Sequence, residues 1–205
     1  KGMKNERLFL TGKINEKNEN GCKDRWNKGF RDLEGVGESE RDFFADTLMK
    51  IILERKNKMN YILKDTSKMN GFTDMRVIFH ALDGIQKNYN WLITDIEYYP
   101  EVEEIKEGTF ISGDELTKLV NQEDIQFIWA VFTGFEKDIK LDINNLEVVP
   151  YIKDHYDFWA NVSIQHPQAM LEIDCCDSSY VTLLSKDELA SQKFGKYFNE
   201  AIELV

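Results

Sequence analysis

The sequence has few of the residues and patterns on which several common protein classes depend. Its 205 residues include three cysteines, three histidines and three prolines, and no run approaches the roughly 18 apolar residues that cross a bilayer. The cysteines form no spaced framework, because Cys175 and Cys176 are adjacent and Cys22 is isolated. Only Leu8 to Leu10 follow the first basic residues, far fewer than the apolar core of a signal peptide. We therefore expect a cytoplasmic protein without a disulfide framework or membrane contact.

Basic charge is scarce in the larger part of the chain. The formal net charge is −11, with 14 basic and 11 acidic residues in 1–58 but 12 basic and 26 acidic residues in 59–205. A duplex nucleic-acid binder neutralises phosphates with a positive surface, so this balance argues against that class. The run from Arg25 to Arg31 mixes basic and aromatic residues as a single-strand binder does, but it is short.

Residues 1–58 differ in composition from the rest of the chain. They hold six of the twelve glycines, none of the prolines and five of the 25 aromatic residues. Ser39 to Asp42 has the form of a helix N-terminus, and the apolar spacing after it predicts an amphipathic helix over 40–56. Two interpretations stay open. Residues 1–58 are an N-terminal arm whose helix docks on an acidic domain, 59–205, or part of them is an extension or added sequence before a natural start at Met59.

From Met59 onward the sequence pattern is that of a mixed domain. It predicts a strand near 60–64, a helix near 73–87, a strand at Trp91–Tyr98, and a helix opened by a capping box at Ser112–Glu115. The almost wholly apolar segment Ile125–Phe132 predicts a central strand covered on both faces. Val148-Val149, before Pro150, is a further short candidate strand.

The clearest β pattern lies near the C-terminus. Residues 169–176 alternate between two faces, Asp177 to Ser179 supply turn residues, and Tyr180–Leu184 returns as the partner strand. A last helix follows from Ser185 to about Glu200, and its Leu189, Phe194, Tyr197 and Phe198 are expected to face the core. The predicted fold class is α+β, in the order β-α-β-α-β-(β)-β-β-α, with a largely antiparallel sheet and helices packed on one face.

Catalytic and cofactor motifs are absent or weak. The histidines and cysteines lack the short spacings of a zinc site, and a set of His155, His166 and Asp174 would have to assemble in space. Ser178 or Ser179 with Asp177 and His166 lacks a nucleophile elbow, and Asp-Ser-Ser is common in turns. Gly35-Val36-Gly37 lacks the third glycine of a dinucleotide motif. We expect no metal, no cofactor and no catalytic residue.

The segment from Pro150 to Pro167 carries the strongest candidate for function. It is a long, irregular connection, and such loops in compact domains often carry binding sites. Aromatic anchors and steering carboxylates are typical of an interface with a basic protein, although the rings could instead cover the core beneath a loop. The candidate binding residues are Tyr151, Asp154, His155, Tyr156, Asp157, Phe158, Trp159 and His166.

Part of the chain resembles a known group of proteins. The segments Trp91–Asp95, Ser112–Leu116, Phe127–Trp129, Phe158-Trp159, Gln165–Pro167, Glu172-Ile173 and Asp177–Ser179 are similar to a family of small uncharacterised bacterial proteins, mostly from Firmicutes. The resemblance covers about 88–198, and Cys175-Cys176 departs from it where a bulkier residue is expected. It implies a cytoplasmic α+β domain of unknown function.

These patterns favour a non-enzymatic module that binds a basic protein partner, of the inhibitor or immunity type. This interpretation rests on the acidic charge of 59–205 together with the aromatic and acidic residues of 150–167. The alternative is an enzyme or small-molecule-binding protein with a pocket around Trp159, His166 and Asp174. The sequence does not determine the oligomeric state.

Overall fold

The computed structural model describes residues 60–64, 66–69, 73–155, 158–160 and 162–204. The chain divides into two units, Lys1–Ile52 and Leu53–Val205, and every described residue belongs to the second. The helix predicted over 40–56 and the proposed boundary at Met59 lie outside the described residues.

The described unit is built on one seven-stranded sheet in which every neighbouring pair is antiparallel. The strand order across the sheet is β3-β2-β4-β5-β6-β1-β7, so the first and last of the described strands, β1 and β7, lie together at one side. The strands are β1 Asn60–Leu63, β2 Tyr89–Tyr99, β3 Thr109–Ser112, β4 Gln126–Glu136, β5 Leu171–Cys176, β6 Tyr180–Ser185 and β7 Ile202–Leu204.

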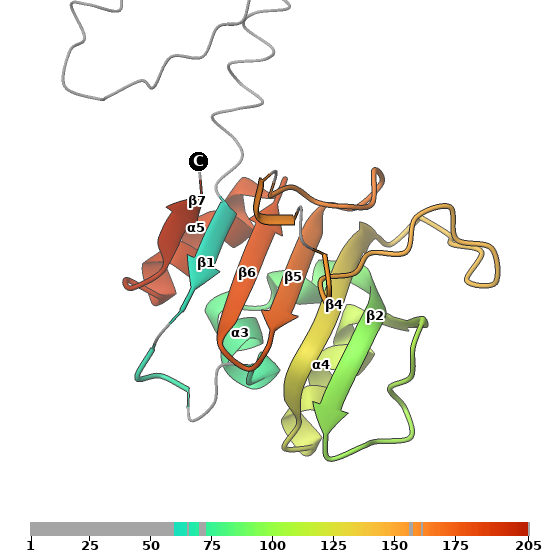
Figure 1. The fold of residues 1–205 in the computed structure, drawn as a ribbon, viewed down its shortest axis with the longest axis horizontal. Helices are drawn as coiled ribbons and strands as arrows, with labels where there is room; N and C mark the ends of the chain where they lie inside the picture. The colour runs from blue at the N-terminus through green and yellow to red at the C-terminus, as the bar shows by residue number, and fades with distance from the viewer. Residues whose placement is uncertain (1–59, 65, 70–72, 156–157, 161, 205) are drawn as a thin grey trace, which may run out of the picture. The chain divides into compact units, whose positions relative to one another are not determined.

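Three helices cover one face of this sheet and lie behind it in Figure 1. They are α3 Met75–Ala81, α4 Gly113–Gln122 and α5 Glu188–Tyr197, with two 3-10 turns, η1 Ile85–Asn88 and η2 Phe158–Ala160. Their apolar residues pack on Trp91, Phe132 and Ile173 of the sheet in one buried core. The predicted α+β class, with helices on one face of an antiparallel sheet, is confirmed.

The helix predicted over 73–87 is shorter in the structure. Its predicted apolar stripe is buried, but α3 ends at Ala81, and η1 begins only after Asp83 and Gly84, whose φ angles are +50° and +89°. Such left-handed conformations end an α-helix, and glycine adopts them at little cost. A single apolar stripe therefore spans two helical segments joined by a turn.

Other boundaries differ from the sequence prediction. The last helix is capped by Asp187, not Ser185, and Leu189 at its start is 54% exposed, so the prediction that Leu189 faces the core was wrong. The edge strands β3 and β7 were not predicted, and Val148-Val149 does not form a strand. Short edge strands carry little alternation and are recognisable only by their pairing with distant strands.

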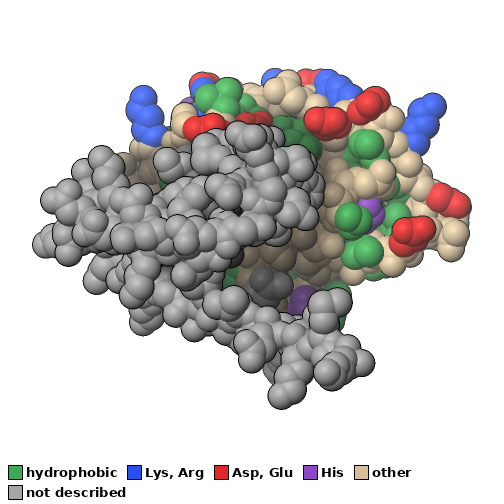
Figure 2. Space-filling model, turned by 90° about the horizontal axis from the view of Figure 1, so that it is seen from above, with side chains coloured by type: hydrophobic (Ala, Val, Ile, Leu, Met, Phe, Trp, Pro, Cys, Tyr) green, Lys and Arg blue, Asp and Glu red, His purple; other side chains and the backbone are tan. Residues whose placement is uncertain are grey.

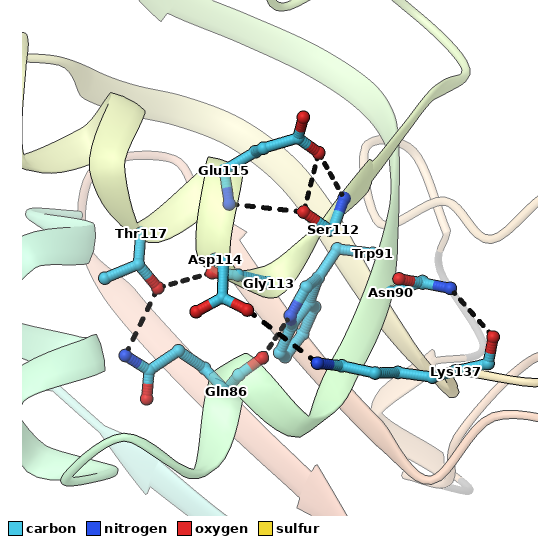
Figure 3. Close-up of polar contacts among 9 residues, drawn as sticks. All are labelled: Gln86, Asn90, Trp91, Ser112, Gly113, Asp114, Glu115, Thr117 and Lys137. Atoms are coloured by element: carbon cyan, nitrogen blue, oxygen red, sulfur yellow. Dashed lines mark hydrogen bonds and ion pairs between the residues drawn. The ribbon is translucent and has the colours of Figure 1, made fainter.

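Figure 3 shows how the corner between β3 and α4 is fixed. Ser112 Oγ accepts a hydrogen bond from the Glu115 backbone N–H, and Glu115 bonds back to the Ser112 backbone N–H, which completes the predicted capping box. The indole N–H of the buried Trp91 donates to the Gln86 carbonyl at 2.9 Å. A Cβ at Gly113 would lie 2.1 Å from that same oxygen, so only glycine fits there.

A long irregular connection covers the second face of the sheet. β4 and β5 are antiparallel neighbours, which a hairpin turn of about two to five residues can join, yet residues 137–170 lie between them. In Figure 1 this β4–β5 connection crosses in front of the sheet. Its apolar side chains form two clusters, one with Leu92 and Phe135 and one with Val131 and Cys176. Both faces of β5 are consequently buried, and its alternate side chains point into two different cores.

Candidate binding site

Two polar side chains of β2 hold the start of the site segment on the sheet. The Thr94 hydroxyl donates to the Pro150 carbonyl at 2.6 Å. Asp95 has a φ of +53°, beside a register shift in the β2–β4 pairing, and its Oδ2 accepts the backbone N–H groups of Ile152 and Lys153 at 2.7 and 2.6 Å. This geometry fixes the direction in which the chain leaves Pro150.

A buried carboxyl group of β5 fixes the other end of the segment. Glu172 is 0% exposed and accepts hydrogen bonds from the backbone N–H and the side-chain amide of Gln165, at 3.0 and 3.1 Å. The side-chain oxygen of Gln165 in turn accepts the Tyr151 backbone N–H at 3.0 Å. The aromatic segment is therefore tied to the interior of the sheet through a chain of specific hydrogen bonds.

A pocket of about 280 Å³ opens between the β4–β5 connection and the sheet. Trp129 on β4, Cys176 on β5 and Tyr180 on β6 come from the sheet, and Tyr180 pairs with Cys176 across the hairpin. The connection contributes the remaining lining residues, which are Ile152, Asp154, His155 and Trp159. The side chains of Ile152 and Phe158 are buried and pack on Val131 of the sheet, so they anchor this part of the connection.

The predicted binding residues divide into exposed and buried groups. Trp159 and Tyr151 are 43% and 46% exposed, so their rings are accessible to a partner. Phe158 is 2% exposed, so its ring covers the core. The rings of Tyr151 and His155 stack at 4.4 Å, and those of Trp159 and Tyr180 meet edge to face at 5.2 Å. Tyr156 and Asp157, also predicted, lie outside the described residues.

His166 lies apart from this pocket. It is 5% exposed, its ring meets that of Phe135 at 4.9 Å, and its Nδ1 accepts the Gln168 backbone N–H at 3.3 Å. Burial lowers the pKa of His166 below its usual value, so the ring is neutral near pH 7. This histidine belongs to the second-face core near the start of β5.

Asp174 is buried beneath the connection and does not line the pocket. The Thr182 hydroxyl donates to its Oδ2, and its Oδ1 has no hydrogen-bond partner among the described residues. Burial raises the pKa of Asp174 to about 7, with a further contribution from Asp95. Burial, and then the neighbouring Asp174, also raises the pKa of Glu172 well above its usual value. These two carboxyl groups on one face of β5 therefore keep their protons to a higher pH than ordinary carboxyl groups do.

The structure does not bring together the serine, aspartate and histidine side chains that were considered as a catalytic set. Ser178 and Ser179 follow the end of β5, whereas His166 precedes its start, and the strand between them spans about 20 Å. Burial raises the pKa of both Cys175 and Cys176, which face opposite cores, so neither thiol is an activated nucleophile. Among the described residues, no group of three or more His, Cys, Asp or Glu side chains could hold a metal ion.

Trp129 and Tyr180 were not among the predicted site residues. The predicted hairpin pairs Tyr180 with Cys176. This pairing would have placed Tyr180 beside the segment 150–167 only if the face of the sheet that this segment covers had been known. Trp129 lies two residues before Val131 and shares its face of β4, but the adjacency of β4 and β5 is a property of strand order. No local pattern in the sequence reveals that order.

These features define an antiparallel α+β domain with an aromatic and acidic pocket on its loop-covered face. No protein family, curated protein or solved structure matches the chain, so the assignment of function rests on the site itself. The similarity to a bacterial family remains a prediction. No helix in the described part of the chain is long and apolar enough to span a membrane.

Proposed function

We propose that this protein is a non-enzymatic binding module that recognises a basic protein partner. The binding region is the aromatic–acidic surface, defined by Tyr151, Asp154, His155 and Trp159 together with Trp129 and Tyr180 of the sheet. An inhibitor or immunity-type role toward a basic toxin is the narrower form of this proposal. A toxin gene next to the gene for this chain would favour that form.

The observation that carries the proposal is the exposure of two large aromatic rings beside a pocket. Tyr151 and Trp159 remain more than two-fifths exposed although Ile152 and Phe158, their neighbours, are almost fully buried. Aromatic side chains of this kind supply the energy of protein interfaces, because they bury a large area at low entropic cost. On the face drawn in Figure 2, hydrophobic side chains are exposed among carboxylates.

The charge of the domain supports the choice of partner. Residues 59–205 carry 26 acidic and 12 basic side chains. An acidic surface accelerates encounters with a basic partner and repels acidic ones, and both effects weaken as salt is added. Charge thus acts on the rate and choice of partner, while the aromatic rings contribute most of the binding energy.

The alternative, an enzyme or small-molecule-binding protein, has one observation in its favour, the pocket itself. Of the three residues first considered for it, Trp159 lines the pocket, whereas His166 and Asp174 do not. A small-molecule function would therefore depend on Asp154, His155 and the aromatic rings. Binding of a neutral metabolite that is independent of salt would favour this alternative.

The proposal is tested by affinity capture from a lysate of the source organism at low and high salt. The wild-type chain, a Y151A/W159A variant and a Y99A control are immobilised in parallel, because Tyr99 is a 75% exposed ring outside the pocket. A basic protein should be retained at low salt by the wild type and by Y99A, retained less at high salt, and lost from the double variant. Retention of no basic protein at low salt would refute the proposal.

A further inference from the structure

Three aromatic side chains from separate parts of the chain meet at the pocket. Trp129 comes from β4, Tyr180 from β6 and Trp159 from η2. The planes of Trp159 and Tyr180 are inclined by 70° with ring centroids 5.2 Å apart, so the two rings form adjoining walls. The electron-rich faces of such rings attract cations, and tryptophan does so most strongly.

The charges around these rings are negative. Asp154 lines the pocket, and none of the described residues that line it is Lys or Arg. Cys176, which lines the pocket, has its pKa raised by burial and, to a smaller extent, by nearby acidic groups that include Asp95 and Asp177. Lys153, next to Asp154, has its ammonium group paired with Glu97 at 2.7 Å. A cation entering the pocket therefore meets an electronegative environment.

The size of the pocket limits what it can accept. At about 280 Å³ it is slightly smaller than the roughly 300–1,000 Å³ typical of ligand sites. It suits one long side chain better than a nucleotide or a large cofactor. A guanidinium group is planar and weakly hydrated, stacks on aromatic rings and pairs with a carboxylate through two hydrogen bonds, whereas an ammonium group is a strongly hydrated point charge.

We propose that this pocket receives the guanidinium group of an arginine side chain presented by the basic partner. The aromatic walls hold the flat face of the group, and the Asp154 carboxylate at the pocket binds its N–H donors. The inference rests on the proposed function and adds the chemical identity of the residue that the partner inserts.

The test compares three heptapeptides in fluorescence titrations with the full chain. One peptide is all lysine, the second has arginine at the centre of the lysines, and the third has neutral citrulline there, which has the shape of arginine without its charge. We expect the arginine peptide to bind roughly tenfold tighter than the equally charged lysine peptide, because the ring contacts favour guanidinium. The citrulline peptide should bind no better than the lysine peptide.

Two variants locate the effect. W159L and D154N should each reduce the preference for arginine to about onefold, while Y99L and D138N, which alter an exposed ring and an exposed carboxylate elsewhere, should retain it. Circular dichroism confirms that each variant is folded. Equal binding of the arginine and lysine peptides, both lost at high salt, would overturn the arginine pocket and leave the proposed function standing. Failure of both peptides to bind at low salt would overturn both.

Discussion

At the scale of single residues, the most unusual groups are the buried carboxyl groups of Glu172 and Asp174. Both are 0% exposed on the same face of β5, and no described residue forms a salt bridge with either. Glu172 uses its oxygens to hold Gln165, but Asp174 has only the Thr182 hydroxyl. A buried charge without a counter-ion is costly, so a proton on these groups stabilises the fold.

The replacement D174N tests this cost through pH. The pKa of Asp174 is about 7 in the folded chain, against about 3.9 in an unfolded one, so between pH 4 and 7 the folded state binds the extra proton. Stability due to this group is therefore fully present below pH 4 and is lost as the pH rises toward 7. Urea unfolding from pH 4 to 8 should show D174N gaining on the wild type as the pH rises.

The exposed D138N provides the matched control, because it removes one carboxyl group from the surface. Its stability should follow the wild-type curve over the same range. Parallel curves for D174N and the wild type would mean that Asp174 is ionised in the folded chain.

At the scale of elements, the β4–β5 connection depends on a few polar contacts as well as on its apolar anchors. Asp95 accepts hydrogen bonds from two consecutive backbone N–H groups, an exposed one of Lys153 and a part-buried one of Ile152, and an N–H group that is shielded from water and left without a partner costs about 1–3 kcal/mol. Its positive φ is tolerated by aspartate and asparagine far better than by alanine. Asp95 is therefore a positioning residue for the aromatic–acidic surface.

The replacement D95A should loosen this segment without unfolding the sheet. We expect faster amide exchange at Ile152 and Lys153, and a loss of global stability of about 2 kcal/mol from the unpaired Ile152 N–H group and the strained backbone. Hydrogen exchange read residue by residue, together with urea unfolding, measures both. D95N keeps a side-chain oxygen and removes the charge, so it should retain most of the protection. Equal exchange in D95A and the wild type would show that the apolar anchors suffice.

The elements also differ in how far the sequence predicts them. The β5–β6 hairpin and the Ser112 capping box were correctly predicted because both depend on neighbouring residues in the chain. The break at Gly84 was missed because the apolar stripe continues through it. The irregular segment after Pro150 was expected, but its position over the second face depends on contacts with Val131 and Leu184 that sequence spacing does not encode.

At the scale of the whole molecule, the compact unit Leu53–Val205 contains every described strand and helix and the β4–β5 connection. A chain of residues 53–205 should therefore fold alone, with a cooperative thermal transition within a few degrees of that of the full chain. Circular dichroism during heating measures this. Insoluble expression or a much lower melting temperature would show that the first unit contributes to the fold.

The candidate site was predictable only in part for the same reason of scale. Composition pointed to the acidic domain, and the aromatic residues of 150–167 pointed to one segment of it. The pocket also needs Trp129 and Tyr180, which come from strands whose neighbours are set by the global strand order. A pattern read along the chain cannot supply that order, because it arises from pairing between distant segments.

The pairing of β1 with β7 determines how the domain responds to force. Asn60 lies opposite Leu204, so the points where the chain enters and leaves the described domain are neighbours at one side of the sheet. The hydrogen bonds of an antiparallel pair run perpendicular to the strands. Tension between residues 60 and 204 therefore loads them one after another, as in opening a zipper, and the domain should yield first by peeling β7 from β1.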